Sequence, residues 1–398
     1  MTSMHVMIDA REAGPQPSGL ARYTFNLLRG LARFGQGHRY SILTNHPELL
    51  PELHGRPDFE LINPGVRIVD PREQVLLPAL VARVKPQIFH SPSMVAPRYL
   101  PKHVKRILTL HDTIPLSCPE GFKWHQRLGW KLYYAASIKP VAHASDRILT
   151  VSEWSKGDIS RQLDIPKERI SVVYNWLEEH FGPVSDAHVE AVKQKYDLPD
   201  RFIFALGSHY RYKNPEGLLH AFSAIAPKHP DLKLLLKIGR PKRLDALVRR
   251  LGLQDRVKYQ GFVPDDELPA LYRAASCFAF PSFYEGFGLP PLEAMLCGTP
   301  VVASHASSIP EVTGEAALAF DPADTTALAQ SLDRVLSDAQ LADSLRLAGF
   351  AQATKFSVQR GIAETIALYQ DVLGLGETPS EGMTQTLTPA GETRERRP

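Results

Sequence analysis

The segment Phe280–Pro300 reads FPSFYEGFGLPPLEAMLCGTP and lies between two continuous apolar runs, Cys277–Phe280 and Pro300–Ala303. The two runs predict buried strands. The loop after the first run carries two glycines, and we expect a helix to begin near Leu289–Pro291, because proline is well accepted in a first helical turn. A strand, a loop, a helix and a second strand in this order are typical of a parallel α/β sheet.

The same pattern recurs along the chain. Continuous apolar runs suit strands that are covered on both faces, as in parallel sheets. These runs are His5–Ile8, Tyr40–Leu43, Val66–Val69, Gln87–His90, Ile107–Leu110, Arg147–Val151, Ile170–Tyr174, Phe202–Leu206, Leu232–Ile238, Val257–Tyr259, Cys277–Phe280 and Pro300–Ala303. Segments with helical periodicity lie between them, and one carries its apolar residues at Leu20, Tyr23, Leu27, Leu31 and Phe34. We therefore predict an α/β fold with doubly wound parallel sheets.

The strand–helix series appears twice, which predicts two Rossmann-like domains. The first series ends near Tyr174, a polar stretch follows, and a new strand begins at Phe202. We expect domains at residues 1–180 and 190–355 that face each other across a central cleft, where the ligands of such sheets usually bind. A last helix over residues 356–373 is expected to pack back on the first domain. Residues 374–398 are poor in apolar side chains and predict a disordered tail.

Composition excludes several classes of protein. With 398 residues, a prior of about 150 residues per domain gives two or three domains. The 46 basic and 43 acidic side chains leave a net charge of +3, which argues against a nucleic-acid partner. Cysteine spacing of the C-x-x-C type is absent, and so is an apolar run of about 18 residues. Met1 is followed almost directly by an apolar strand rather than a signal peptide, so we expect a cytoplasmic protein.

Two carboxylates mark the loop and helix of the opening segment. Glu285 lies in the loop and Glu293 lies about one turn into the helix. Glycines let the backbone approach a ligand, and a helix start offers free N–H groups and a positive dipole end. This combination suits a phosphate next to hydroxyl groups, although a capped helix with surface glutamates would give the same pattern. The glycines do not form the G-x-G-x-x-G dinucleotide fingerprint, which disfavours an oxidoreductase.

Together with other segments, Glu285 and Glu293 resemble the E-x7-E signature of the retaining glycosyltransferases of family 4, which have the GT-B fold. The further matching segments are Asp9, Arg11 and Ser18–Tyr23, Leu110–Asp112, Val151–Ser155, Leu206–Gly207 with Lys213–Asn214, and Ser308–Val312 with Gly314–Ala316. The resemblance extends over residues 5–373. It implies an enzyme that transfers a sugar from a nucleotide-sugar donor.

The resemblance also implies roles for residues of the second domain. Glu293 would bind the donor ribose and Glu285 the hydroxyls of the transferred sugar, while Lys213 would neutralise the donor pyrophosphate. The residues expected at the donor are Gly207, Arg211, Lys213, Arg240, Glu285, Gly286, Phe287, Gly288, Leu289 and Glu293. Fixed cations and amides of this kind stabilise the charge that develops as a nucleoside diphosphate departs.

An arginine is expected beside Lys213, but the sequence leaves its identity open. Members of the family carry it at the positions that Ser208 and Tyr212 occupy here, so Arg211 and Arg240 are the candidates. A D-x-D sequence, with which many metal-dependent sugar transferases hold an ion on the pyrophosphate, is absent. We therefore expect neither a metal requirement nor another cofactor.

Three residues of the first domain complete the predicted site. The resemblance places His111 beside the transferred sugar, as a third catalytic residue with Glu285 and Lys213. Gly19 and Asp112 are assigned to the acceptor side, Asp112 to hold or cap its loop. Retention through same-face attack is expected, so that Glu285 orients the sugar rather than bonding to it. A glutamate nucleophile, as in retaining glycosidases, is the alternative.

Similarity to bacterial mannosyltransferases of O-antigen and exopolysaccharide synthesis implies GDP-mannose as donor and a glycan or polyprenyl-linked acceptor. Residues 98–106 and 123–139 mix basic and aromatic side chains, and they are candidates for contact with an anionic membrane at the inner face of the cytoplasmic membrane. Ordinary helices with solvated lysines would look the same. The alternative functions are a non-catalytic nucleotide-sugar binding module and a sugar-nucleotide epimerase or phosphorylase of the same fold.

Overall fold

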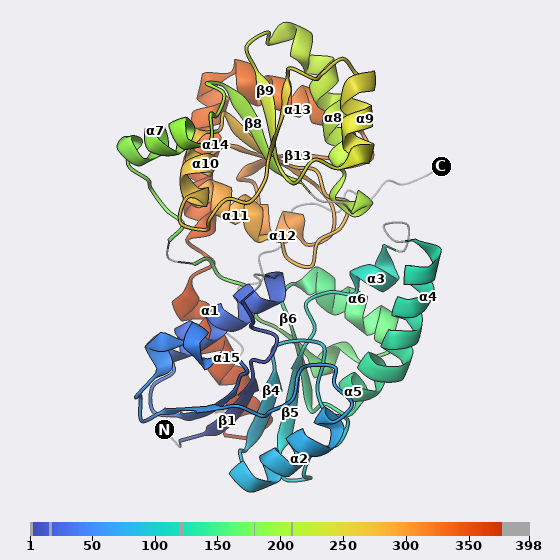
Figure 1. Ribbon diagram of the computed structural model, residues 1–398, viewed down its shortest axis with the longest axis vertical. Coiled ribbons are helices and arrows are strands. Elements are labelled where there is room, and N and C mark those ends of the chain that lie inside the picture. The colour runs from blue at the N-terminus through green and yellow to red at the C-terminus, as the bar shows by residue number, and fades with distance from the viewer. Residues whose placement is uncertain (1–2, 16–17, 119–122, 179, 208–209, 376–398) are drawn as a thin grey trace, which may run out of the picture.

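The computed structural model describes residues 3–15, 18–118, 123–178, 180–207 and 210–375. Within these residues the chain forms two wholly parallel sheets, one of seven strands and one of six, in two domains stacked along the long axis (Figure 1). The predicted fold class is therefore confirmed. Most of the predicted tail, from residue 376 onward, lies outside the described residues.

The first sheet has the order β3-β2-β1-β4-β5-β6-β7. Its strands are β1 (His5–Asp9), β2 (Arg39–Leu43), β3 (Phe59–Ile62), β4 (Ile88–Ser91), β5 (Lys105–Thr109), β6 (Arg147–Thr150) and β7 (Ile170–Val172). The α-helices of this part are α1 (Gly19–Phe34), α2 (Glu73–Val84), α3 (Ile114–Ser117), α4 (Trp124–Tyr133), α5 (Lys139–His143) and α6 (Glu153–Leu163), with a π-helix at Tyr134–Ile138. Short 3₁₀ turns lie at Pro47–Leu49, Pro51–Leu53 and Lys167–Arg169.

The second sheet has the order β10-β9-β8-β11-β12-β13. Its strands are β8 (Phe202–Leu206), β9 (Lys233–Lys237), β10 (Val257–Gln260), β11 (Cys277–Phe280), β12 (Val301–Ser304) and β13 (Ala317–Phe320). The helices are α7 (Asp186–Lys195), α8 (Pro215–Ile225), α9 (Lys242–Arg250), α10 (Leu268–Ala274), α11 (Leu289–Leu296), α12 (Ile309–Thr313), α13 (Thr325–Ser337), α14 (Ala339–Ala353) and α15 (Val358–Val372). Short 3₁₀ turns lie at Arg211–Lys213 and Ala226–Lys228.

Both faces of each sheet are covered, which explains the continuous apolar runs. In β1, Val6 and Ile8 join the apolar cluster on one face, and Met7 joins the cluster on the other face. Alternate side chains of a strand point to opposite faces, so a strand buried on both sides needs apolar residues at every position.

One predicted strand was wrong and two strands were not predicted. Residues 66–69 form no strand, because Val69 has a φ of +66° and its side chain is 57% exposed. The chain pairs Phe59–Ile62 with β2 instead, and it adds Ala317–Phe320 beside β12. Both are edge strands with partly exposed side chains, so their apolar signal in the sequence is weak.

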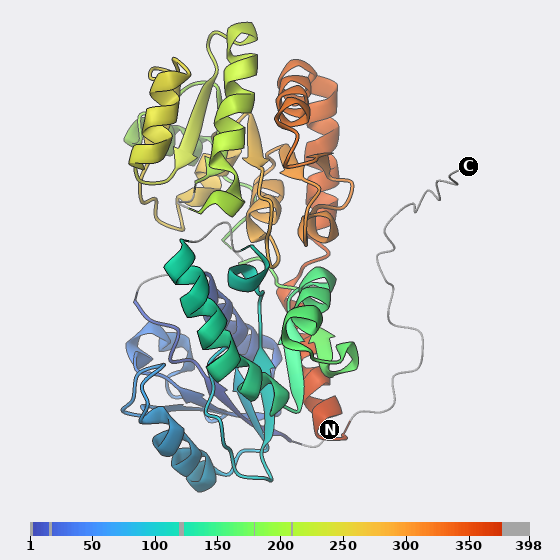
Figure 2. The ribbon, with the colours of Figure 1, turned by 90° about the vertical axis from the view of Figure 1, so that its right-hand side faces the viewer.

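The final helix, α15, packs on the first domain although it follows the second in sequence (Figure 2). Its Ile362 lies against Gly30 of α1, where an added Cβ would come within 2.6 Å of the isoleucine side chain. Its Tyr369 hydroxyl lies 2.7 Å from Nδ1 of His90 in β4. The two domains are therefore joined twice, by the segment before α7 and by the segment before α15.

Candidate functional site

Loops at the carboxyl ends of the central strands of the two sheets meet between the domains. The loop after β5 carries His111 and Asp112, and the loop after β11 carries Glu285 and Gly286. The carboxyl ends of parallel strands are the usual ligand side of doubly wound sheets. This junction is where most of the predicted site residues gather.

Lys213 and Glu285 form a direct ion pair. The Lys213 Nζ lies 2.6 Å from Oε1 and 2.7 Å from Oε2 of Glu285. Lys213 ends the 3₁₀ turn after β8 and is followed by Asn214, whose left-handed φ of +52° allows its side chain to cap α8 at Gly217. The backbone of Lys213 is therefore fixed between the 3₁₀ turn and the start of α8. Its side chain is one quarter exposed and contacts the buried carboxylate of Glu285.

The loop before α11 is fixed from within the second domain. Ser307 accepts a hydrogen bond from the Glu285 backbone N–H at 2.9 Å, and the Ser308 hydroxyl donates to the carbonyls of Glu285 and Phe287. Gly288 has a φ of +108°, a conformation that favours glycine, and it turns the chain into α11.

The start of α11 offers fewer donors than the sequence pattern suggested. Pro290 and Pro291 lack an N–H group, so Leu289 alone among the first three helical residues can donate. The amides of Gly286, Phe287 and Gly288 in the preceding loop supply the remaining backbone donors near this end. An anion here would therefore be bound mainly by the loop.

Gly286 packs closely against the first domain. A Cβ at this position would lie 2.8 Å from the carbonyl oxygen of His111 and 3.0 Å from the Cβ of Asp112. The Gly286 carbonyl accepts hydrogen bonds from the hydroxyls of Ser152 and Ser155, at 2.7 and 2.9 Å. Both serines belong to the first domain, so this glycine is required by the packing of one domain on the other.

Burial determines the charge of His111 and Asp112, which lie in the loop after β5. It lowers the pKa of His111 to about 4, and the ring packs edge-on against Tyr23 with centroids 4.5 Å apart while Nε2 lies 3.1 Å from the carbonyl oxygen of Pro92. Burial raises the pKa of Asp112 to about 6, opposed by the Ile114 N–H that donates to Oδ1. His111 is thus neutral near pH 7.

Glu293 is buried on α11, and its carboxylate contacts Tyr272 and Arg22 rather than Lys213, the partner of Glu285. Its Oε2 accepts a hydrogen bond from the Tyr272 hydroxyl at 2.8 Å, and its Oε1 lies 3.4 Å from Nη2 of Arg22. Arg22 stands on α1 of the first domain, so this ion pair crosses the junction. Arg22 belongs to the matching segment Ser18–Tyr23, but it is not among the predicted site residues.

Four predicted residues lie outside these contacts. Arg211 is exposed, and Arg240 pairs with Asp245 of α9 at 2.7 Å. Among the described residues, no hydrogen bond or ion-pair network links either arginine to the Lys213–Glu285 pair. Gly207 packs tightly on Ile238, where a Cβ would come within 2.6 Å. Gly19 is exposed, and a Cβ there would meet nothing within 4 Å. Ser208 lies outside the described residues.

Further contacts across the junction were not predicted. Both carboxylate oxygens of Glu311 accept backbone N–H groups at the start of α6, from Glu153 at 2.8 Å and Trp154 at 2.7 Å. The Tyr284 hydroxyl donates to Oδ2 of Asp158 at 2.5 Å. Such pairs join residues more than 120 positions apart, so local sequence patterns do not indicate them. Among the described residues, no group of three or more His, Cys, Asp or Glu side chains is placed to hold a metal ion.

Two family models match the chain. The model described as Glycosyltransferase Family 4 matches residues 17–180, and the model described as Glycosyl transferases group 1 matches residues 189–351. The first model spans β2 to β7 of the first sheet, and the second model spans all six strands of the second sheet.

Individual proteins give the same result. The O-antigen chain mannosyltransferase B of Escherichia coli is 35% identical over 334 residues, which cover 82% of this chain and 84% of that protein. The serotype-specific mannosyltransferase WbdA of Escherichia coli is 30% identical over 294 residues, which cover 71% of this chain and 36% of WbdA. The crystal structure of Anabaena HepE in complex with UDP and glucose shares the fold, with a TM-score of 0.67 and 20% identity over 92% of this chain and 100% of that chain.

Proposed function

Because this chain belongs to the glycosyltransferases of family 4, we propose that it transfers mannose from GDP-mannose to a glycan or polyprenyl-linked acceptor in cell-surface polysaccharide synthesis. The observation that carries the proposal is the Lys213–Glu285 pair, placed opposite His111 and Asp112 at the carboxyl ends of both sheets. The names of the E. coli relatives support mannose as the sugar and O-antigen as the kind of product.

The proposed mechanism retains the configuration of the sugar. Departure of the nucleoside diphosphate builds negative charge on its oxygens, and Lys213 with the loop amides would stabilise that charge. The acceptor hydroxyl then attacks the face that the diphosphate leaves and transfers its proton to a departing phosphate oxygen. Glu285 has both oxygens within 2.7 Å of Lys213, and this contact occupies the atoms that would attack the sugar, which favours orientation of the sugar over nucleophilic attack. Neutral His111 would hydrogen-bond a hydroxyl of the transferred sugar.

A panel of nucleotide sugars tests the donor assignment. A ligand that binds only the folded chain raises its stability by about 2.7 kcal/mol when present at about 100 times its Kd. We expect GDP-mannose to raise the melting temperature more than UDP-glucose, UDP-GlcNAc or GDP alone. Metal independence is part of the proposal, because Lys213 and amides supply the positive charge, so excess EDTA should leave the shift unchanged. A shift with another nucleotide sugar alone, or one restored only by magnesium, would contradict this donor or its metal independence.

We also propose that α4 contacts an anionic membrane surface. The helix exposes Trp124, Leu128 and Leu132, which are spaced four residues apart on one face and are 53–76% exposed. The segment 123–133 carries three Lys and Arg side chains and no acidic one, and α4 lies at the outer edge of the first domain (Figure 1). Basic helices with exposed tryptophan and leucine suit the surface of anionic bilayers. Within the described ranges, none of the helices has the length and apolar character needed to cross a bilayer.

Vesicle flotation tests the membrane contact. We expect the chain to float with phosphatidylglycerol-containing vesicles but not with phosphatidylcholine vesicles. Replacing Trp124, Leu128 and Leu132 together with serine should abolish flotation. Leu347→Ser provides a control, because this leucine is 72% exposed on the second domain and should be irrelevant. Equal flotation of the triple variant, or none by the unaltered chain, would exclude this surface.

A further inference from the structure

Arg22 joins three separate parts of the chain. It lies in the first turns of α1, and its Nε and Nη2 both lie 2.9 Å from Oε1 of Glu178 in the segment that connects the domains. The same Nη2 lies 3.4 Å from Oε1 of Glu293 on α11. The guanidinium also lies over the ring of Phe181, 5.9 Å from its centroid. One side chain of the first domain thus reaches a buried carboxylate of the second.

Arg22 offsets part of the cost of burying the Glu293 carboxylate. Burial raises the pKa of Glu293, and Arg22 is the main group that opposes this rise. Burial also disfavours the charge on Arg22, but Glu293 and Glu178 outweigh it and raise the arginine's pKa. The other groups that face Glu293 are Tyr272 on α10, Lys237 at the end of β9, Asp265 before α10 and Cys297 at the end of α11. Lys237 is the other cation in this set, and burial lowers its pKa.

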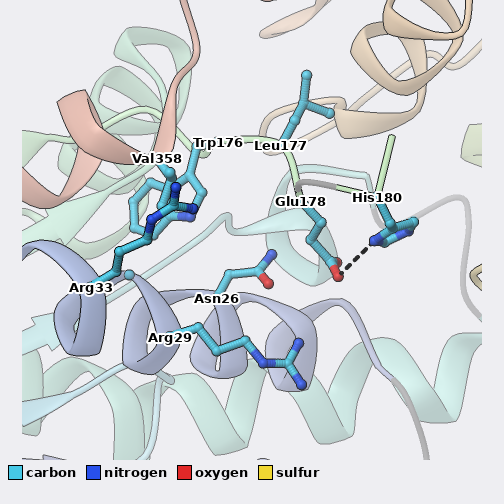
Figure 3. A pocket seen from close by; sticks show the side chains of 9 residues that line it. Asn26, Arg29, Arg33, Trp176, Leu177, Glu178, His180 and Val358 are labelled. Atoms are coloured by element: carbon cyan, nitrogen blue, oxygen red, sulfur yellow. Dashed lines mark ion pairs between the residues drawn. The ribbon is translucent and has the colours of Figure 1, made fainter. Parts of the chain in front are cut away.

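Glu178 anchors Arg22 from the side of the connecting segment. Figure 3 shows Glu178 reaching toward His180, and its Oε2 lies 3.6 Å from Nδ1 of that ring. The two residues line a cavity of about 270 Å³ between α1, this segment and the start of α15. Glu178 therefore has one oxygen on Arg22 and the other near His180, which restricts where the guanidinium can lie.

On the premise of the proposed function, and of the donor-ribose role that the family resemblance implies for Glu293, we propose that Arg22 is a donor-positioning residue supplied by the acceptor-side domain. It holds the Glu293 carboxylate charged and aimed, while Tyr272 fixes the other oxygen. An ionised carboxylate is the stronger acceptor for a hydroxyl group. Donor affinity then depends on α1 keeping Arg22 within reach of Glu293 on α11, so each domain contributes to nucleotide recognition.

Titration calorimetry with GDP and 2′,3′-dideoxy-GDP tests the role of Arg22. The unaltered chain should bind GDP more tightly, because the dideoxy form lacks both ribose hydroxyls. Arg22→Gln should weaken GDP binding roughly tenfold, as expected when a hydrogen bond to a charged group is lost, and leave dideoxy-GDP binding unchanged. Arg29→Gln is the matched control, because Arg29 lies two turns further along α1 and pairs with exposed Glu52. It should bind both ligands as the unaltered chain does.

The pH dependence of the preference for GDP over dideoxy-GDP is a second measurement. If Arg22 were only structural, its substitution would not move this pH dependence. Preference for GDP over dideoxy-GDP needs ionised Glu293, so it should be lost as the pH falls through the pKa of this group. Removing Arg22 removes the cation that lowers this pKa, so Arg22→Gln should move the loss to higher pH. Arg22→Lys keeps the charge and should restore most of the normal midpoint. A lysine variant that folds but no longer prefers GDP over dideoxy-GDP would contradict the role, even if the glutamine variant unfolds.

The outcomes separate the two proposals. If Arg22→Gln weakens both ligands equally, or neither, the positioning role is wrong although the donor site stands. If Arg22→Gln leaves the pH midpoint unchanged, the role is also wrong. If the unaltered chain does not distinguish GDP from its dideoxy form, the ribose role of Glu293 fails, and the role of Arg22 fails with it.

Discussion

Lys213→Gln should lower kcat for sugar transfer by about 10²- to 10³-fold, the usual cost of removing one fixed group that stabilises developing negative charge. Glutamine keeps much of the length of the side chain but cannot carry the charge that, in the proposed mechanism, offsets the departing diphosphate. The change also leaves the buried Glu285 without the ammonium group 2.6 Å from its carboxylate. The measurement is steady-state release of the nucleoside diphosphate, with melting temperature recorded on the same samples.

Lys228→Gln is the matched control for this change. Lys228 also pairs with a carboxylate, that of Asp333 at 2.7 Å, but its side chain is 67% exposed and lies away from the loops between the domains. Exposed ion pairs contribute about 0–1 kcal/mol, so kcat and stability should both stay close to normal. A Lys213→Gln variant that folds and keeps more than half of the normal kcat would remove this lysine from the mechanism.

Gly286→Ala should lower kcat by about 100-fold, the scale of loss that a misplacement of about 1 Å produces at a reacting centre. The new Cβ would meet the His111 carbonyl oxygen at 2.8 Å, and a backbone atom cannot move aside as a flexible side chain would. The domains must then separate slightly, which shifts the loop that carries Glu285 away from His111. We expect the melting temperature to change little, because the apolar clusters of each sheet remain intact.

Gly157→Ala is the control for the glycine substitution. Gly157 lies in α6, the helix whose N-terminal residues include Ser155, and an added Cβ there meets nothing within 4 Å. Alanine favours a helix over glycine by about 1 kcal/mol, so stability should be equal or slightly higher and kcat unchanged. Full turnover by Gly286→Ala would show that the close approach of the two loops is not needed for transfer.

The sequence predicted the parts of the fold that depend on local pattern. Buried central strands such as Phe202–Leu206 appear as unbroken apolar runs, and proline with glycine marked the start of α11. The edge strands β3 and β13 were missed because half-exposed strands do not need such runs. The strand predicted over residues 66–69 was wrong because apolar composition does not reveal a left-handed residue such as Val69.

The site was predictable only where a known motif marked it. Glu285 and Lys213 are 72 residues apart, and family resemblance rather than spacing suggested that both face the donor. Arg22 lies 271 residues from Glu293, so the sequence offered no local sign of this ion pair. Arg240 was a candidate by position after a strand, yet Asp245, five residues along the chain, pairs with it. The contacts between the domains depend on how the two sheets pack on each other, and local patterns in a single sequence do not predict that packing.

Transfer of radiolabelled mannose from GDP-mannose into a lipid-extractable or polysaccharide product tests the central claim most directly. The measurement compares the unaltered chain with Lys213→Gln on the same membrane-derived acceptor fraction. For the unaltered chain, we predict that GDP release is matched by an equal amount of new α-mannoside. For Lys213→Gln, we predict that both products form about 10²- to 10³-fold more slowly. Donor binding without any glycoside product would indicate a binding module, and conversion of the sugar nucleotide without an acceptor would indicate an epimerase. Either result would contradict glycosyl transfer by this chain.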